Sequence, residues 1–252
     1  MTEPVLRTEA LSKRFGGLSA VSDVAIDLRH GEVHALIGPN GAGKSTLINL
    51  LSGAATPTSG SVRFEGREIA GLAFDRVARL GIARSYQRTT VFRDFTAFEN
   101  CRLAAQARLP SSMRFIRPAL SYRALVEAAQ RALALVGLQG SADRAASSLS
   151  HGEQRQLEIA MTLATEPKVL LLDEPLAGMG AEESRRMVTL IATLAERHAI
   201  LLVEHDMDAV FSIARRLTVM VNGRVLESGA PEAIRESPAV QEAYLGGAEA
   251  AP

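Results

Sequence analysis

The fold of this chain follows from one stretch, Ala35-Leu36-Ile37-Gly38-Pro39-Asn40-Gly41-Ala42-Gly43-Lys44-Ser45-Thr46. From Gly38 the pattern is G-x-x-x-x-G-K-S, which is typical of a loop that wraps phosphate groups. The run at residues 32–37 predicts a short strand before the loop, and the apolar positions at residues 47–51 predict a helix after it. A strand, a glycine-rich loop and a helix in this order aim backbone N–H groups at a polyphosphate.

Two side chains of this loop have separate tasks in phosphate binding. Lys44 reaches the β- and γ-phosphates as a positive charge, and the hydroxyl of Ser45 is suited to ligate Mg²⁺. The glycines permit backbone conformations that a Cβ would forbid. A chance match to a glycine-rich turn is the alternative, but the complete motif with both flanks in place favours a nucleotide site.

Composition narrows the function classes. The chain has 252 residues and is 47% hydrophobic, enough for one large domain or for a core with a subdomain. Lys and Arg together number 28, as do Asp and Glu, so no charge excess indicates nucleic acid or an anionic membrane surface. Tryptophan is absent and aromatic residues are sparse, which argues against a protein that stacks single-stranded bases. We therefore expect no nucleic-acid partner.

Cysteine content and apolar runs bear on the compartment. Cys101 is the single cysteine, so no intrachain disulfide is possible, which suits a reducing compartment. Met1-Thr2-Glu3-Pro4 does not begin a charged and then apolar leader, and no apolar run approaches the roughly 20 residues that span a bilayer. If the protein works at a membrane, we expect it to act as a peripheral subunit.

Alternating strand and helix patterns predict an α/β core with a mainly parallel sheet. The apolar runs at residues 169–172 and 199–203 predict strands that are buried on both faces. Asn222-Gly223 between two strand patterns predicts a hairpin. After Pro231 we expect one more helix.

An antiparallel β region is predicted at residues 5–30, ahead of the phosphate loop. Its candidate strands are residues 5–8 and 21–28, and a turn is expected at residues 13–17. This turn carries Phe15, which either stacks on an adenine ring or packs on its own sheet. Spacing alone leaves both possibilities open.

Residues 88–148 change character, because strand patterns vanish and alanine becomes frequent. Helices are predicted at residues 96–107 and 123–136. We interpret this block as a helical subdomain inserted into a core made of residues 1–87 and 149–252. Four apolar residues stand at its entrance, and we expect at least two to pack internally and the rest to form an apolar docking surface: Val91, Phe92, Phe95 and Phe98.

Two carboxylates follow the apolar run at residues 169–172. Adjacent acids at the end of a buried strand are costly unless a cation or a reaction requires them, and ligands bind at this end of open α/β sheets. Asp173 suits Mg²⁺, directly or through water. Glu174, on the opposite side along the pleat, is placed to orient or deprotonate a water. The alternative is an ordinary solvated strand end.

Four further polar residues are ambiguous when the sequence around each is taken alone. Gln87 ends a predicted strand, and His205 follows another, where a histidine is structural or binds metal. The sequence lacks a matching His/Cys cluster, which argues against a metal ligand. Ser150 with Glu153 three residues later predicts a capping box at the start of a helix.

Taken together and in order, these residues resemble the ATP-binding subunits of ABC transporters. The resemblance covers nearly the whole chain, and Leu149-Ser150-His151-Gly152-Glu153 between Gln87 and Asp173 is what distinguishes this family from other phosphate-loop enzymes. Within the family the chain is similar to the subunits of branched-chain amino acid importers. That similarity rests on Gly81-Ile82-Ala83-Arg84-Ser85-Tyr86-Gln87, Val91-Phe92-Arg93-Asp94-Phe95-Thr96, Leu157-Glu158-Ile159-Ala160, Ala177-Gly178-Met179, Glu204-His205-Asp206-Met207 and Glu242-Ala243-Tyr244-Leu245-Gly246.

The resemblance implies that the ligand is ATP with Mg²⁺, and that the chain hydrolyses it. Phe15 would stack on the adenine, and the phosphates would lie on a cradle formed by Gly38, Pro39, Asn40, Gly41, Ala42, Gly43, Lys44, Ser45 and Thr46. Gln87 would sense Mg²⁺ and the attacking water at the contact with the transmembrane partner. Asp173 would hold Mg²⁺ through water, Glu174 would be the general base, and His205 would contact the γ-phosphate.

The resemblance also implies partners. Ser150, Gly152 and Glu153 would close over ATP held by a second ATPase subunit, which is either the same chain or a related one. We expect Lys44 and Ser150 to lie too far apart to share one phosphate, so that ATP closes a pair of subunits and hydrolysis reopens it. The block at residues 88–148 would dock transmembrane permease subunits at the cytoplasmic face of the plasma membrane. A solute-binding protein would act indirectly.

Two positions depart from the family pattern. His151 replaces the usual first glycine of the signature, and we expect this to cost little. Gly180 stands where many relatives have an aspartate, which weakens any inference about communication between two sites.

Three other functions fit the sequence less well than import. A lipopolysaccharide-export ATPase has a similar subunit, but Gly178-Met179 and the ending at residues 242–246 favour import. A soluble ABC protein for translation or repair usually carries two cassettes or a long insertion, and this chain has one cassette. A scaffold that binds nucleotide without hydrolysis is disfavoured by the intact Asp173-Glu174 pair and His205.

Overall fold

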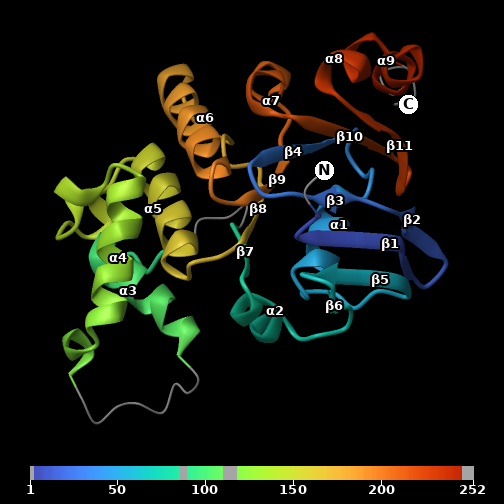
Figure 1. Cartoon of the computed structure of the whole chain (residues 1–252). Coiled ribbons are helices and arrows are strands. Elements are labelled where there is room, and N and C mark those ends of the chain that lie inside the picture. The colour runs from blue at the N-terminus through green and yellow to red at the C-terminus, as the bar shows by residue number, and fades with distance from the viewer. Residues whose placement is uncertain (1–2, 86–89, 110–117, 246–252) are drawn as a thin grey trace.

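In the computed structural model, two sheets and a group of helices make up the described part of the chain, which is residues 3–85, 90–109 and 118–245. Figure 1 shows the helices α3, α4 and α5 gathered on one side and the two sheets on the other. The first helix, α1 (Lys44–Leu51), packs between the two sheets, since its Leu47, Ile48 and Leu51 share one buried cluster with strands of both.

The central sheet has six strands in the order β11-β10-β4-β9-β8-β7. All neighbouring pairs are parallel except β10 with β11, which confirms the predicted mainly parallel sheet and the Asn222-Gly223 hairpin. Both faces of β8 are covered: Leu170 and Leu172 belong to one buried cluster, and Leu171 to another. The strands are β4 (Glu32–Ile37), β7 (Ile82–Arg84), β8 (Val169–Asp173), β9 (Ala199–Val203), β10 (Arg216–Val221) and β11 (Arg224–Gly229).

The second sheet is antiparallel, as predicted for the N-terminal region, in the order β2-β1-β5-β6 with β3 also paired to β1. The predicted turn at residues 13–17 is wrong in extent, because β1 continues to Phe15 and only Gly16 and Gly17 turn the chain. The last residues of β1 pair with β2, but their side chains are exposed. The sequence there therefore does not alternate between apolar and polar residues, and the strand could not be recognised from it. The strands are β1 (Leu6–Phe15), β2 (Leu18–Val24), β3 (Asp27–Leu28), β5 (Ser59–Phe64) and β6 (Arg67–Glu68).

The remaining helices of the α/β part follow the strands they connect. They are α2 (Phe74–Leu80), α6 (Ala181–Ala195), α7 (Met207–Ile213), α8 (Pro231–Glu236) and α9 (Pro238–Leu245). The single helix expected after Pro231 is wrong, because the chain forms two. Ser237 has φ −68° and ψ 120° between them, and a residue that precedes a proline is driven out of the helical region in this way.

The helical block contains α3 (Ala97–Ala105) and α4 (Arg123–Leu135), close to the predicted bounds. Short 3-10 turns flank them at Gln106–Arg108, Ala119–Ser121, Gln139–Ser141 and Ala146–Ser148. Both helices pack on α5 (His151–Ala164). Within the described ranges, no helix is both long and apolar enough to cross a bilayer.

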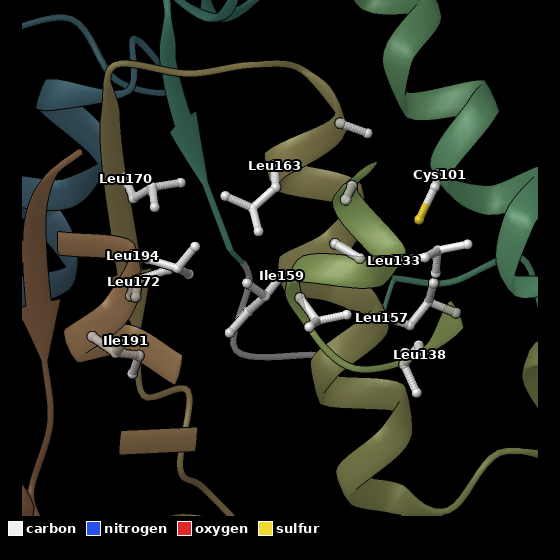
Figure 2. Close-up of a cluster of buried hydrophobic side chains, with 14 of the residues drawn as sticks. Cys101, Leu133, Leu138, Leu157, Ile159, Leu163, Leu170, Leu172, Ile191 and Leu194 are labelled. Atoms are coloured by element: carbon white, nitrogen blue, oxygen red, sulfur yellow. The ribbon is translucent and has the colours of Figure 1, made fainter. Parts of the chain in front are cut away.

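Helix α5 joins the helical block to the central sheet. In Figure 2, its Leu157, Ile159 and Leu163 lie between Cys101 and Leu133 of the helical block on one side and side chains of β8 and α6 on the other. One buried cluster therefore runs from α3 to β9. This close packing fixes the start of α5, and with it the position of Ser150. The predicted domain boundary at residue 148 stays a prediction.

His34 is a buried titratable group inside β4, the strand that leads into the phosphate loop. Its Nε2 lies 2.7 Å from the Thr218 hydroxyl and its Nδ1 lies 3.0 Å from the carbonyl oxygen of Asp27. Burial lowers the pKa of His34 from 6.5 to about 4, against a smaller opposing effect of the Asp27 hydrogen bond. The unfolded chain therefore binds a proton here at a higher pH than the folded chain does.

Acidification between pH 6.5 and about 4 is expected to destabilise the protein through His34. In this window the unfolded state binds more protons, so the free energy of unfolding falls with pH, by up to ~3 kcal/mol from this group. Urea unfolding at pH 7 and pH 4.5 measures this decrease in the free energy of unfolding. The decrease should be smaller in His34→Gln than in the wild type. His30→Gln, at an exposed histidine nearby, is the control. Equal losses in wild type and His34→Gln would contradict the assignment.

Candidate active site

A cleft of about 560 Å³ opens at the carboxyl ends of the central strands. It brings together the phosphate loop, the end of β1 and the residues that follow β8 and β9, which are distant in sequence. Its lining consists of Phe15, Leu18, Ser19, Ala20, Asn40, Gly41, Ala42, Gly43, Lys44, Ser45, Thr46, Glu174, His205, Asn222 and Gly223. Of the predicted cradle residues, only Gly38 and Pro39 are not part of this lining.

Gly38 and Gly43 are required by the shape of the loop. Gly38 has φ +149°, and a Cβ there would lie 2.1 Å from the carbonyl oxygen of Met220. Gly43 has φ +99°, and a Cβ there would lie 2.4 Å from the carbonyl oxygen of Ala20. Gly43 is also the N-cap of α1, whose first turn has no side-chain cap and no acidic residue. The first N–H groups of α1 are therefore available to an anion in the cleft.

The Lys44 side chain folds back along the loop. Its ammonium group donates to the carbonyl oxygens of Gly38 at 2.6 Å and Pro39 at 3.0 Å. Burial lowers the pKa of Lys44, while the charges of Glu174 and Asp173 raise it. The arrangement places one positive charge inside the loop, where a phosphate group can pair with it, and close enough to Glu174 and Asp173 for their charges to act on it.

Asp173 ends β8 with its carboxylate almost fully buried. Its Oδ2 accepts a hydrogen bond from Arg84 at 3.0 Å. Its Oδ1 is buried and has no hydrogen-bond partner among the described residues. Burial raises the pKa of Asp173, and the charges of Arg84 and Lys44 oppose that rise.

Glu174 lies just beyond the end of β8, and its geometry differs from the one expected. Its φ is +52° and its N–H donates to the carbonyl oxygen of Val203 at 2.9 Å. A turn of the backbone, rather than alternation along a pleat, therefore brings its side chain into the cleft lining. A non-glycine residue in this conformation costs on the order of 1 kcal/mol or more, and such residues are enriched at functional sites.

His205 lies beside Glu174 in the cleft lining, with its Nε2 2.7 Å from Glu174 Oε1. The sequence interpretation gave no role to the neighbouring Glu204, which is buried and ties two loops together. Glu204 accepts hydrogen bonds from the N–H of Leu176 at 2.7 Å and from the N–H of His205 at 3.1 Å, and burial raises its pKa. The available signal was an acid placed directly after a fully apolar strand, the same pattern that pointed to Asp173.

Arg84 and Asn49 are also site residues that the sequence interpretation missed. Arg84 ends β7, and besides Asp173 it contacts the amide oxygen of Asn49 on α1 at 2.5 Å. The signal for Arg84 in the sequence was weak, a cation inside a predicted strand that we expected to end at Gln87. The end of β7 at Arg84 and its pairing with β8 are known only from the structure.

The residues present fit a Mg²⁺ ion. The buried Oδ1 of Asp173 and the exposed hydroxyl of Ser45 are oxygen ligands of the kind Mg²⁺ prefers. No group of three or more His, Cys, Asp or Glu side chains in the described ranges is arranged to hold a metal. Mg²⁺ bound through one or two protein groups and substrate phosphates does not need such a group. Gln87, the third predicted ligand, lies outside the described residues, and its role stays a prediction.

Phe15 is exposed at the edge of the cleft, with 53% of its surface accessible. Lys13 places its ammonium group 4.9 Å from the ring centroid. The ring is not packed into its own sheet, which was one of the two alternatives. Its position in the cleft lining supports the other, a surface for a flat ring to stack on.

The signature residues form a second, separate hollow of about 70 Å³, lined by Ser150, Gly152, Glu153, Gln156, Met179, Glu183, Arg186 and Met187. None of these residues lines the cleft that contains Lys44. The predicted capping box is confirmed: Ser150 Oγ accepts from the Glu153 N–H at 3.2 Å, and Glu153 accepts from the Ser150 N–H at 2.8 Å. Gly152 also permits close packing, because a Cβ there would meet the Glu183 carboxylate at 2.4 Å.

The two departures from the family pattern have structural counterparts. The His151 ring lies against Gly178, where a Cβ would approach its Nε2 to 3.0 Å. A glycine at position 178 therefore makes room for a large residue at position 151. Gly180 is the N-cap of α6, and without a side chain of its own it relies on Glu183, which accepts from the Gly180 N–H at 3.3 Å.

The apolar residues at the entrance of the helical block divide as predicted. Val91 and Phe98 pack against the buried cluster, while Phe92 and Phe95 are exposed and stack on each other at 5.4 Å. Asn100 is fully buried and braces this pair, accepting from the Phe92 N–H at 2.8 Å and donating to the Phe92 carbonyl at 3.0 Å.

Comparison with known proteins identifies the family of the chain. Residues 21–177 match a family described as ABC transporter, and residues 224–250 match one described as branched-chain amino acid ATP-binding cassette transporter. The chain is 42% identical to the high-affinity branched-chain amino acid transport ATP-binding protein LivG of Salmonella typhimurium, over 98% of this chain and 99% of that protein. The protein BraF of Pseudomonas aeruginosa, with the same description, is also 42% identical over the same shares.

Solved structures of ATP-binding cassettes share the fold. A nucleotide-free cassette from an ABC transporter superposes with a TM-score of 0.86 at 30% identity, covering 96% of this chain and 98% of that one. The ADP conformation of a cassette gives a TM-score of 0.85 at 31% identity, covering 97% of this chain and 100% of that one. With relatives at this identity along almost its entire length, the chain belongs to the ATP-binding proteins of the ABC transporter family.

Proposed function

We propose that this chain binds and hydrolyses ATP with Mg²⁺ to power import of branched-chain or related amino acids. The observation that carries the proposal is the single cleft that holds the phosphate loop, Glu174 and His205 together. The substrate class rests on the names of the relatives and on the match of residues 224–250.

In the proposed mechanism the chain mainly positions ATP and stabilises charge. Phe15 stacks on the adenine, Lys44 and the N–H groups of the loop hold the phosphates, and Asp173 with Ser45 holds Mg²⁺. Bound there, Mg²⁺ would offset the negative charge of the β- and γ-phosphates. Glu174 accepts the proton of the attacking water, and His205, 2.7 Å from it, orients this carboxylate and contacts the γ-phosphate.

The separation of the two hollows supports a paired mechanism. Lys44 and Ser150 line different hollows, so one chain supplies two half-sites. Ser150 is the exposed N-cap of the 14-residue helix α5, and the N–H groups at this helix end can meet an anion. In our proposal, Ser150, Gly152 and Glu153 of one subunit close over ATP held by the other. Loss of the γ-phosphate then reopens the pair.

The proposed partners are transmembrane permease subunits and, through them, a solute-binding protein. The helical block meets the permease, and the exposed Phe92–Phe95 pair supplies an apolar contact on it. The protein would then work as a peripheral subunit on the cytoplasmic face of the plasma membrane.

Reconstitution tests this function and separates it from its rivals. The tagged chain is purified from detergent-solubilised membranes, its co-purifying proteins are identified, and the complex is placed in proteoliposomes. We expect ATP hydrolysis and leucine uptake that both require the solute-binding protein. Hydrolysis stimulated by lipopolysaccharide instead would favour export. Full activity of the chain without any membrane partner would favour a soluble ABC protein.

A further inference from the structure

Arg84 links three elements of the site through one guanidinium group. It projects from the end of β7, its Nη2 lies 3.0 Å from Asp173 Oδ2 on β8, and its Nη1 lies 2.5 Å from Asn49 Oδ1 on α1. The Arg84 and Asp173 side chains are only 9% and 3% exposed. Such a buried bridge is not a surface ion pair, and its geometry is set by a planar fork that meets two oxygens at once.

The two oxygens of Asp173 are in different situations. Oδ2 is engaged by Arg84, whereas Oδ1 is buried with no hydrogen-bond partner among the described residues. A buried carboxylate oxygen without a partner is costly, which points to a ligand that completes it. The bond from Arg84 to Oδ2 fixes the plane of the carboxylate, and the direction of Oδ1 is fixed with it. Without that bond the carboxylate could turn about its Cβ–Cγ bond and move either oxygen out of this direction.

The backbone of β7 supports this arrangement. Arg84 is paired with Leu171 in the parallel ladder between β7 and β8. The next residue, Ser85, accepts a hydrogen bond from the Asp173 N–H at 3.3 Å. Two consecutive residues of one strand end therefore hold both the backbone and the side chain of Asp173.

We propose that Arg84 is a positioning residue that fixes the Asp173 carboxylate, so that Oδ1 remains directed to the Mg²⁺ of bound Mg-ATP. Asn49 on α1 sets the orientation of the guanidinium group. The inference rests on the proposed function for the presence of Mg-ATP. Arg84 lies in the stretch at residues 81–87 that carries the family resemblance, but the resemblance gave it no role.

Nucleotide affinity with and without Mg²⁺ tests this role. ATP is titrated calorimetrically in EDTA and in excess Mg²⁺, and the ratio of the two dissociation constants is the gain from the metal. For Arg84→Met we expect this gain to fall about tenfold or more, with affinity in EDTA within about twofold of wild type. Arg84→Lys, which keeps the charge but not the fork, should recover part of the gain, and Asn49→Ala should lose a smaller part.

The control is Arg79→Met, which breaks an exposed ion pair between Arg79 and Asp75 on α2. Mg²⁺ should increase the ATP affinity of this control by the same factor as in wild type. An unchanged or larger gain in Arg84→Met, or an equal loss of affinity in EDTA, would overturn the proposal. If Arg84→Met does not fold, Arg84→Lys and Asn49→Ala decide by the same ratio. If Mg²⁺ does not increase the ATP affinity of the wild type, the proposed binding of Mg-ATP is wrong. This result differs from a normal Mg²⁺ effect in both wild type and Arg84→Met, which would reject only the role of Arg84.

Discussion

Replacing Glu174 with glutamine is expected to slow ATP hydrolysis by about 10²–10⁴-fold, the usual contribution of a positioned general base. Glutamine has the same shape but cannot take a proton from the attacking water. The amide can still hydrogen-bond to His205, which lies 2.7 Å from Glu174 Oε1 in the present arrangement. The phosphate loop and Lys44 are untouched, so ATP should bind as tightly as before.

The same variant should accumulate the closed pair of subunits, because ATP enters the site and is not consumed. Size-exclusion chromatography with Mg-ATP measures this as a shift to dimer that disappears without nucleotide. Phosphate release measured on the same samples gives the rate. Glu127→Gln, at an exposed position on α4, is the matched control and should behave as wild type. Hydrolysis by Glu174→Gln at the wild-type rate would show that the base lies elsewhere.

Replacing Lys44 with alanine is expected to weaken ATP binding by about 30-fold or more. Truncating one partner of a buried, hydrogen-bonded charge pair costs about 2–5 kcal/mol, and each 1.4 kcal/mol is tenfold in affinity. The change also removes the donor that now satisfies the carbonyl oxygens of Gly38 and Pro39. The loop therefore loses its positive charge and also two hydrogen bonds that stabilise its conformation.

Calorimetric titration with ATP measures this loss, and Lys44→Arg separates its two causes. Arginine keeps the positive charge, so affinity should fall less than in Lys44→Ala if charge dominates. Thermal unfolding without nucleotide measures the contribution of the Lys44 hydrogen bonds to stability. A lower Tm of Lys44→Ala in this experiment would come from the loss of these bonds and not from ATP. A dissociation constant for Lys44→Ala equal to that of wild type would remove Lys44 from the phosphate site.

Features made by neighbours in sequence could be predicted well. The phosphate loop, the Ser150–Glu153 capping box and the Asn222-Gly223 hairpin each depend on a few consecutive residues and on backbone angles that those residue types favour. The errors have local causes too. At Phe15 the strand is exposed and leaves no alternating pattern, and at Ser237 a following proline divides one helix into two.

The sequence by itself determined the nucleotide chemistry, the α/β class and the acids and histidine that follow the buried strands. Only the tertiary structure decided how these groups are held. Arg84 reaches Asp173 across 89 positions and Glu204 reaches Leu176 across 28. Such pairs depend on which strands lie side by side and in what register. Periodicity within a single strand carries no information about either, because it reports burial and not the identity of the neighbour.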